Sequence, residues 1–292
     1  MGTTTITQPA YWIKQWHALN ARNTAFRGYG TAHTWNRMAA RYGRDDEDEK
    51  DKRETGIAET CAFLEHEGVS FKGSRILDIG CGPGHYALAF AERGAHVVCI
   101  DSAENMIARL REEMPESLQE NITPLHADWH ILDLEEHGFT KAFDLVFANM
   151  TPAVTGPETF MKLMDASRQW CWFRGWAGKR ENPVLEGLHR ELYGGESNLF
   201  YGNFIIAFNL VYSLGFFPFC TFRSTGWARK TALSEAIEFY SNFFHSGETQ
   251  PPDELREKIA RYLEKIANDG YIEYAAGGHT GAMLWNSNDR HT

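Results

Sequence analysis

The chain has 292 residues, of which 43% are hydrophobic and 13% aromatic, and its formal net charge is −10. This length and hydrophobic content allow one large α/β domain with an additional segment. An acidic chain is repelled by a phosphate backbone, and the sequence holds no basic run, so nucleic acid is not expected as a partner. No apolar run is long enough to span a membrane, and the first residues lack a signal-peptide pattern, so we expect a cytoplasmic protein.

The cysteines agree with that expectation. Their number is odd and no two of them form a C-x-x-C pair, so they fit neither a closed disulfide framework nor a common zinc motif. We expect reduced, buried thiols at Cys61, Cys81, Cys99, Cys171 and Cys220.

The first third of the chain is expected to be helical. Trp12, Trp16 and Leu19 recur at helical spacing. The charged run 44–54 contains five consecutive acidic residues at 45–49, which could be a metal cluster. We interpret it instead as a solvated loop and helix start, because acidic side chains favour a helix N-terminus.

From residue 72 onward, expected strands and helices alternate. Short apolar runs predict strands, and amphipathic runs between them predict helices. The expected strands are 75–79, 96–100, 122–126, 143–148 and 170–176, and the expected helices are 86–93, 104–113 and 158–169. Alternation at this spacing predicts a parallel sheet covered by helices on both faces.

The last third continues the pattern with a change at the end. A long connection at 180–202 precedes helices expected at 203–214, 234–244 and 253–266 and strands expected at 217–225 and 278–285. Two late strands separated by helices suit a sheet that is closed by one antiparallel strand.

A glycine-rich turn follows the first expected strand. The stretch 76–84 reads ILDIGCGPG, with glycines at 80, 82 and 84. Glycines let a ligand approach the main chain, and the following helix N-terminus offers free N–H groups. The spacing differs from the dinucleotide fingerprint G-x-G-x-x-G. Asp78 would repel a pyrophosphate but can bind a cationic amine, so the turn favours S-adenosylmethionine, which carries an amine, a carboxylate and a sulfonium.

Polar residues follow the next strands at the positions where open α/β sheets bind ligands. Asp101 ends the second strand, where a carboxylate can accept hydrogen bonds from ribose hydroxyls. Asp128 follows the third strand and can accept from the adenine amine, and Trp129 can stack on the ring. Asn149 follows the fourth strand. Met106 is equally well explained as an adenine contact or as a helix core residue.

About residues 53–176 resemble class I S-adenosylmethionine-dependent methyltransferases. The resemblance lies in the order of four motifs: the glycine turn with Asp78, then Asp101, Asp128 and the sequence FDLV at 143–146. The resemblance implies a mostly parallel seven-stranded sheet of order 3-2-1-4-5-7-6, with strand seven antiparallel. It also implies adenosine lying over the carboxyl ends of strands one and two.

The sequence WNRMAARY at 35–42 resembles the W-x-x-x-A-x-x-Y segment that forms a lid over the cofactor in this family. We therefore expect residues 1–52 to form a helical lid that faces the substrate, and 53–292 to form the cofactor-binding domain. Within it, 180–202 is expected to be a substrate-facing insertion. The residues expected to bind the cofactor are Trp35, Asp78, Gly80, Cys81, Gly82, Gly84, Asp101, Ser102, Met106, Asp128, Trp129, Asn149 and Met150.

Methyl transfer from a sulfonium mainly requires proximity and alignment, and it requires a base only if the acceptor arrives protonated. No sharp catalytic motif is present. His17 and His33 are candidate bases and Tyr193 a candidate substrate contact, each with a surface or packing role as the simpler interpretation. His126 and His130 lack the further ligands of a metal site, so no metal is expected.

Two features bear on the acceptor. Trp170, Trp172, Arg174 and Trp176 alternate on the fifth strand and could form an aromatic or cationic wall, although packing under a helix is favoured. The segment 149–152 reads NMTP and lacks the adjacent prolines and the aromatic residue of the Asn/Asp-Pro-Pro-Tyr/Phe motif. This argues against methylation of a planar amine.

The leading hypothesis is a methyltransferase that acts on a small molecule, with the acceptor atom and the oligomeric state left open. Methylation of protein or RNA, and a non-catalytic regulatory protein that binds an adenosyl ligand, remain as alternatives. A nicotinamide dehydrogenase ranks last because the glycine spacing is wrong.

Overall fold

The computed structural model describes residues 5–22, 31–40, 42–43, 47–178, 180–195, 202–245 and 250–290. The strands are β1 (Arg75–Ile79), β2 (His96–Asp101), β3 (Ile122–His126), β4 (Phe143–Asn149), β5 (Ser167–Trp176), β6 (Phe219–Ala232) and β7 (Tyr271–Asn286). The helices are α1 (Pro9–Arg22), α2 (Ala32–Met38), α3 (Glu47–His66), α4 (His85–Glu92), α5 (Glu104–Glu113), α6 (Pro157–Ala166), α7 (Pro183–Tyr193), α8 (Asn203–Ser213), α9 (Leu233–Phe244) and α10 (Asp253–Ile266), with a 3-10 turn at Glu116–Leu118.

The strands form one sheet in the order β3-β2-β1-β4-β5-β7-β6, which confirms the predicted topology. β1 pairs in parallel with β2 and β4, and β7 runs antiparallel between β5 and β6. β1 occupies the middle of the parallel part and is almost wholly buried after Arg75, as expected for a strand covered on both faces. The glycine turn that follows β1 therefore starts from a rigid position.

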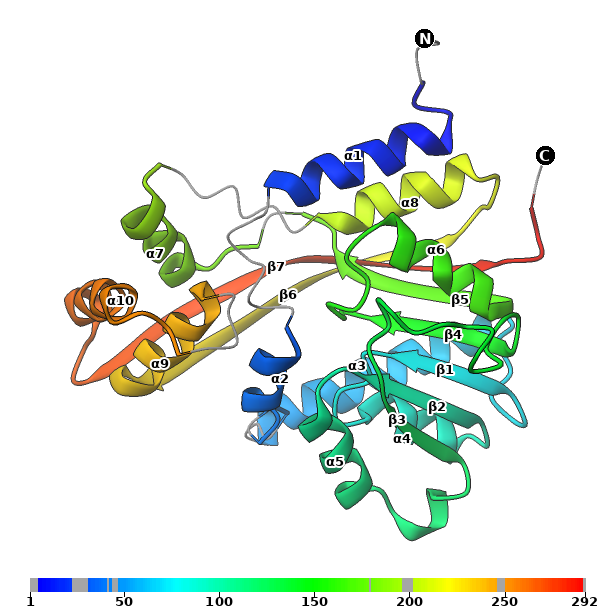
Figure 1. Cartoon of the computed structure of the whole chain (residues 1–292). Coiled ribbons are helices and arrows are strands. Elements are labelled where there is room, and N and C mark those ends of the chain that lie inside the picture. The colour runs from blue at the N-terminus through cyan, green and yellow to red at the C-terminus, as the bar shows by residue number, and fades with distance from the viewer. Residues whose placement is uncertain are drawn as a thin grey trace.

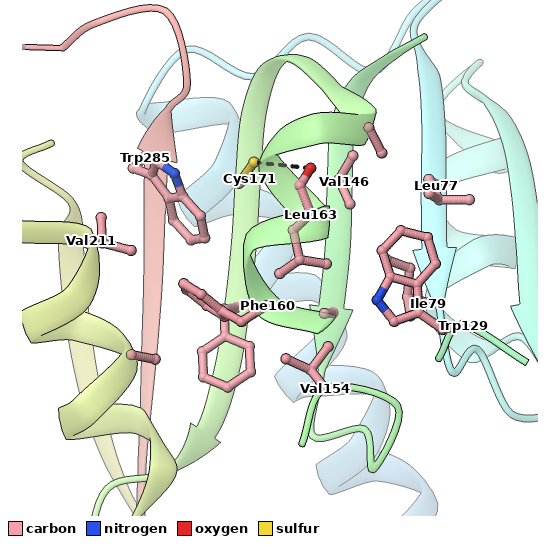
Figure 2. Packing of buried hydrophobic residues seen from close by; sticks show 14 of the residues in the cluster. Leu77, Ile79, Trp129, Val146, Val154, Phe160, Leu163, Cys171, Val211 and Trp285 are labelled. Atoms are coloured by element: carbon pink, nitrogen blue, oxygen red, sulfur yellow. Dashed lines mark hydrogen bonds between the residues drawn. The ribbon is translucent and has the colours of Figure 1, made fainter. Parts of the chain in front are cut away.

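Helices cover both faces of the sheet (Figure 1). α1, α6 and α8 pack together on one face, and α3, α4 and α5 lie on the other. Figure 2 shows the core under the first group, where Phe160 of α6 stacks on Trp285 of β7 with ring centroids 5.7 Å apart. In the same layer the thiol of Cys171 donates to the carbonyl of Leu163 at 3.7 Å. Both layers hold the strand ends in place.

β6 and β7 extend beyond the parallel strands as a long two-stranded ribbon (Figure 1). α7, α9 and α10 pack against this extension and enclose a separate apolar cluster that includes Leu188, Tyr240, Ile259, Leu263 and Ile272. We call this part, residues 180–193, 226–245 and 253–277, the ribbon lobe. It has its own core, distinct from the two clusters that flank the sheet.

The ribbon corrects the expected strands 217–225 and 278–285, which were much too short. Residues 226–232 and 271–277 lack an alternating apolar pattern, yet they pair with each other from Gly226↔Gly277 to Ala232↔Tyr271. The length of β6 and β7 is set here by main-chain hydrogen bonds between the two strands. The sequence of one strand does not show which strand it pairs with.

Two further boundaries differ from expectation. The helix expected at 158–169 ends at Ala166, because β5 already begins at Ser167, which pairs with Phe143. The connection 180–202 contains α7, which was not predicted. This helix begins with the Asn182 side chain, which accepts a hydrogen bond from the Leu185 N–H at 2.9 Å, followed by Pro183 at its first position.

The cysteines are free thiols, as expected, and Cys61, Cys99 and Cys171 are buried. Cys220 is exposed, contrary to expectation, because it lies near the start of the edge strand β6. Among the described residues, no helix combines the length and the apolar character needed to cross a bilayer.

The ribbon lobe should unfold locally when its own core is weakened. Leu263→Ala removes a fully buried side chain and should destabilise the lobe by about 2–5 kcal/mol. Hydrogen exchange should show faster opening of α9 and α10 but unchanged protection of β1. Glu264→Ala, an exposed neighbour on the same helix, is the control. Equal loss of protection in β1 would show that the lobe has no core of its own.

Candidate functional site: a cavity at the ends of the parallel strands

A cavity of about 990 Å³ lies at the carboxyl ends of β1, β2 and β4 and extends to β5 and β6. Its walls include the glycine turn, parts of α2 and α3, and the segments that follow β3 and β4. Every residue expected to bind the cofactor lines this cavity except Gly84. The structure thus brings together residues that lie between positions 35 and 150 of the sequence.

The glycine turn is shaped by close contacts. Gly80 has φ +66°, and a Cβ there would lie 1.8 Å from Thr151 Oγ1. Its N–H donates to the carbonyl of Ile100 at 2.7 Å, which ties the turn to β2. Gly84 has φ +85°, and a Cβ there would lie 2.3 Å from a methyl group of Leu110 on α5. Both positions therefore require glycine, Gly80 beside the cavity and Gly84 beneath α5.

Asp101 is fixed by two backbone hydrogen bonds. Its Oδ2 accepts from the Gly82 N–H at 2.9 Å, and its Oδ1 accepts from the Ala103 N–H at 2.8 Å. Burial nevertheless raises the pKa of this carboxyl, and the two hydrogen bonds oppose that rise. Each oxygen keeps a further lone pair, so the carboxylate can accept a pair of hydroxyl groups from the cavity.

Asp78 lies at the same end of the sheet and is only 4% exposed. Burial, and then the neighbouring charge of Asp101, raise the pKa of Asp78 to about 8. No cation among the described residues pairs with it. A carboxylate in this setting fits a ligand that brings a positive charge, as the amine of S-adenosylmethionine does.

The segment after β3 is held by a chain of hydrogen bonds. Asp128 Oδ1 accepts from the His130 N–H and also contacts His130 Nδ1, both at 2.9 Å. His130 Nε2 lies 3.0 Å from Thr155 Oγ1, and His126 Nε2 lies 3.1 Å from the carbonyl of Ser102. Both histidines are therefore engaged by protein groups, and only His130 lines the cavity.

Trp129 and Met106 offer little surface to the cavity, each being 1% exposed. The Trp129 indole N–H donates to the carbonyl of Thr159 at 3.0 Å, and the Lys162 ammonium lies 4.5 Å from the ring centroid. Met106 packs with Ala103 under α2. Both side chains support the wall from behind, and stacking of Trp129 on adenine stays a prediction.

The N-terminal helix α2 contributes Thr31, Ala32 and Trp35 to the cavity wall. It is attached to α5, since the Asn105 N–H donates to Asn36 Oδ1 at 2.8 Å. The buried guanidinium of Arg109 donates to the carbonyl of Ala39 at 3.0 Å and also to that of Tyr42. These contacts place α2 next to the cofactor residues, as the lid hypothesis requires.

The wall opposite the glycine turn was largely missed by sequence reasoning. It consists of Arg174 on β5 and Arg223 and Thr225 on β6, and Tyr86, which follows the turn on α4, reaches Arg174. Arg174 belonged to the alternating set considered as a cationic wall, and it faces the cavity. Trp172 of the same set packs on Phe147, with ring centroids 5.8 Å apart. No local signal marks the residues of β6, because they reach the cavity only through the pairing of β6 with β7.

A second cavity of about 610 Å³ adjoins the first. Tyr42, Arg53 and His85 line both. The rest of its wall comes from α2 and from residues of the ribbon lobe such as Arg180, Trp227 and Tyr240.

The candidate catalytic residues lie elsewhere. His17 pairs with Glu158 at 3.1 Å on the surface, His33 is exposed on α2, and Tyr193 contacts the rings of His189 and Phe244. None of the three candidates lines either cavity. The acidic residues Asp45 and Asp46 lie outside the described residues.

Comparison with known proteins agrees with this site. Residues 76–171 match the family model described as a methyltransferase domain. The ubiquinone biosynthesis O-methyltransferase of Maricaulis maris is 32% identical over 120 residues, 36% of this chain and 41% of that protein. An uncharacterized protein of Haemophilus influenzae is 24% identical over 218 residues, 74% of this chain and 76% of that protein.

Among solved structures, magnesium protoporphyrin IX methyltransferase of Synechocystis, crystallised with bound SAH, is 14% identical with a TM-score of 0.49, over 91% of this chain and 94% of that one. The chain spans less than half the length of the similar curated proteins whose names state an activity. Sheet order, glycine turn and family match agree: the chain carries a class I S-adenosylmethionine-dependent methyltransferase domain.

The role expected of Asp101 can be tested by Asp101→Asn, which keeps the shape but removes the charge. We expect S-adenosylhomocysteine to bind about 10- to 100-fold more weakly by calorimetry, the typical loss for hydrogen bonds to a charged group. The control is Asp133→Asn, because Asp133 also accepts backbone N–H groups but lies on an exposed turn outside the cavity. Unchanged affinity in Asp101→Asn would contradict the assignment.

Proposed function

We propose that this chain is an active S-adenosylmethionine-dependent methyltransferase whose acceptor is a small molecule. The observation that carries the proposal is the single cavity of about 990 Å³ that joins the cofactor residues to the wall formed by β5 and β6. Ligand cavities measure about 300–1,000 Å³, so this one has room for the methyl donor and a second small molecule. Residues of α2 form part of its wall, and a site partly covered by this helix suits a compact acceptor.

When bound, S-adenosylmethionine supplies a methyl group on an activated sulfonium. The task of the chain is then to bind, align and exclude water. Asp78 binds the amine of the donor, and Asp101 holds its ribose hydroxyls. Asn149 and Met150, at the end of β4, lie between the glycine turn and Arg174, where the acceptor approaches. The Asn149 side chain is oriented by the Trp172 indole N–H, which donates to Asn149 Oδ1 at 3.2 Å.

The N-terminal segment 1–52 acts as a lid in this proposal. Trp35 and Tyr42 lie edge to face with ring centroids 5.5 Å apart at the cavity wall, where they limit access of water. The segment 180–202 faces the substrate through Arg180, Asn182 and Leu185, which line the adjoining cavity.

The proposal is tested by incubating the protein with methyl-labelled S-adenosylmethionine and a deproteinised cell extract, with total cell protein and RNA as parallel samples. We expect label in a small-molecule product, formation of S-adenosylhomocysteine, and loss of both in Asp101→Asn. Label confined to protein or RNA would refute the acceptor class. Tight S-adenosylhomocysteine binding without turnover in any sample would instead favour a regulatory role.

A further inference from the structure

The main cavity is electrically polarised. Its cofactor end carries the acidic side chains of Asp78, Asp101 and Asp128, whereas the wall of β5 and β6 carries the guanidinium groups of Arg174 and Arg223. The other charged side chains that line the cavity come from α3, namely Asp51, Lys52, Arg53 and Glu59. Together these six leave an excess of positive charge at the far end, in a chain whose net charge is −10.

Arg174 and Arg223 differ in how their charges are compensated. Arg223 forms an ion pair with Glu59 of α3. Arg174 instead donates to the hydroxyl of Thr280, from Nη2 at 3.0 Å and from Nε at 3.3 Å. A hydroxyl is neutral, and among the described residues no carboxylate forms an ion pair with this guanidinium. A half-buried cation inside a ligand cavity without an acidic partner points to an anionic ligand.

The surroundings hold the guanidinium in place. Thr280 on β7 pairs with Trp176 on β5 and with Arg223 on β6. Arg174 is two residues before Trp176, so Arg174, Thr280 and Arg223 share one face of the sheet. The ring of Tyr86 packs on Phe147 at 4.9 Å and brings its hydroxyl beside Arg174. Burial lowers the pKa of Arg174, and the nearby Arg223 charge adds to this. The group stays cationic but is partly stripped of water.

The position favours the acceptor over the donor as the source of the anion. Arg174 is paired with Asn149 on β4, and β4 lies between β5 and β1. Two strand spacings, about 10 Å, therefore separate it from the glycine turn. A donor carboxylate held beside the glycine turn would therefore lie away from this guanidinium.

We propose that Arg174 anchors an oxyanion group, a carboxylate or a phosphate, on the methyl acceptor. The inference rests on the proposed function and narrows it to anionic small molecules. The guanidinium binds the anionic end, Thr280 positions the guanidinium, and the reacting atom of the acceptor points back toward the sulfonium. Arg229 and Arg180 continue the cationic lining into the adjoining cavity.

The test titrates inorganic phosphate, and separately acetate, into the protein saturated with S-adenosylhomocysteine, with chloride keeping the ionic strength constant. Thermal stability and tryptophan fluorescence report binding. We expect at least one of the two anions to bind better than chloride, and Arg174→Gln to weaken that binding about tenfold or more. Arg174→Lys keeps the charge but loses the planar guanidinium group, so its anion affinity should lie between those of the wild type and Arg174→Gln.

Arg111→Gln is the matched control, because Arg111 lies on α5 outside both cavities. Binding of S-adenosylhomocysteine by Arg174→Gln should stay within about threefold of the wild type, which also reports that the variant is folded. In the methylation assay, labelled products should be acids or phosphates, and the primary amide of a labelled acid should be a poor acceptor.

Three results would overturn the inference. Both anions could act no better than chloride on the wild type, or Arg174→Gln could bind them as the wild type does. Alternatively, Arg174→Gln could lose tenfold or more in S-adenosylhomocysteine affinity, which would assign Arg174 to the donor carboxylate. Each of these leaves methyl transfer itself intact, whereas failure of the wild type to bind or use S-adenosylmethionine would refute the proposed function.

Discussion

Two acidic side chains at the ends of β1 and β2, Asp78 buried and Asp101 partly buried, determine the character of the cofactor end. Burial raises the pKa of both, and the neighbouring charge of Asp101 raises that of Asp78 further. Asp101 is compensated by the N–H groups of Gly82 and Ala103, which also fix the turn. Asp78 has no such compensation from the described residues. A ligand with a positive charge next to Asp78 and hydroxyl groups next to Asp101 supplies what the protein leaves unsatisfied.

The rest of the architecture keeps these two groups in position and extends the site from them. The parallel strands bring Asp78, Asp101 and Asn149 to one edge because their carboxyl ends coincide. Arg109 attaches α2 to α5 over that edge. On the other side, the antiparallel insertion of β7 carries β6 far enough to place Arg223 in the same cavity. The cavity therefore changes from acidic to basic along the sheet.

The resemblance to class I methyltransferases predicted the sheet order, and the spacing of residues predicted nearly all of those gathered around the glycine turn. The residues around the turn depend on local sequence: a strand, a turn and a helix in which Gly80, Asp78 and Asp101 stand at fixed separations. The ribbon of β6 and β7, the helix α7 and the place of Arg223 in the cavity wall were not predicted, and Arg174 was weighed only as the less favoured interpretation of its strand. The ribbon and the arginine wall depend on contacts between distant segments, such as Arg174 with Thr280. The helix α7, in contrast, carries local signals that could have been used, namely an Asn182 cap, Pro183 and an amphipathic pattern.

We propose that Asp78 recognises the cationic amine of the methyl donor. The pKa of Asp78 is about 8, so most of these carboxyls hold a proton at pH 7, and a bound ammonium group would drive that proton off. Calorimetry of S-adenosylmethionine in buffers of different ionisation enthalpy should then show release approaching one proton at pH 7, and little above pH 9. Methylthioadenosine, which lacks the amine, should bind without releasing this proton. If Asp78→Asn still binds S-adenosylmethionine, that binding should release no proton either. Equal proton release with both ligands, or none with S-adenosylmethionine, would contradict the account.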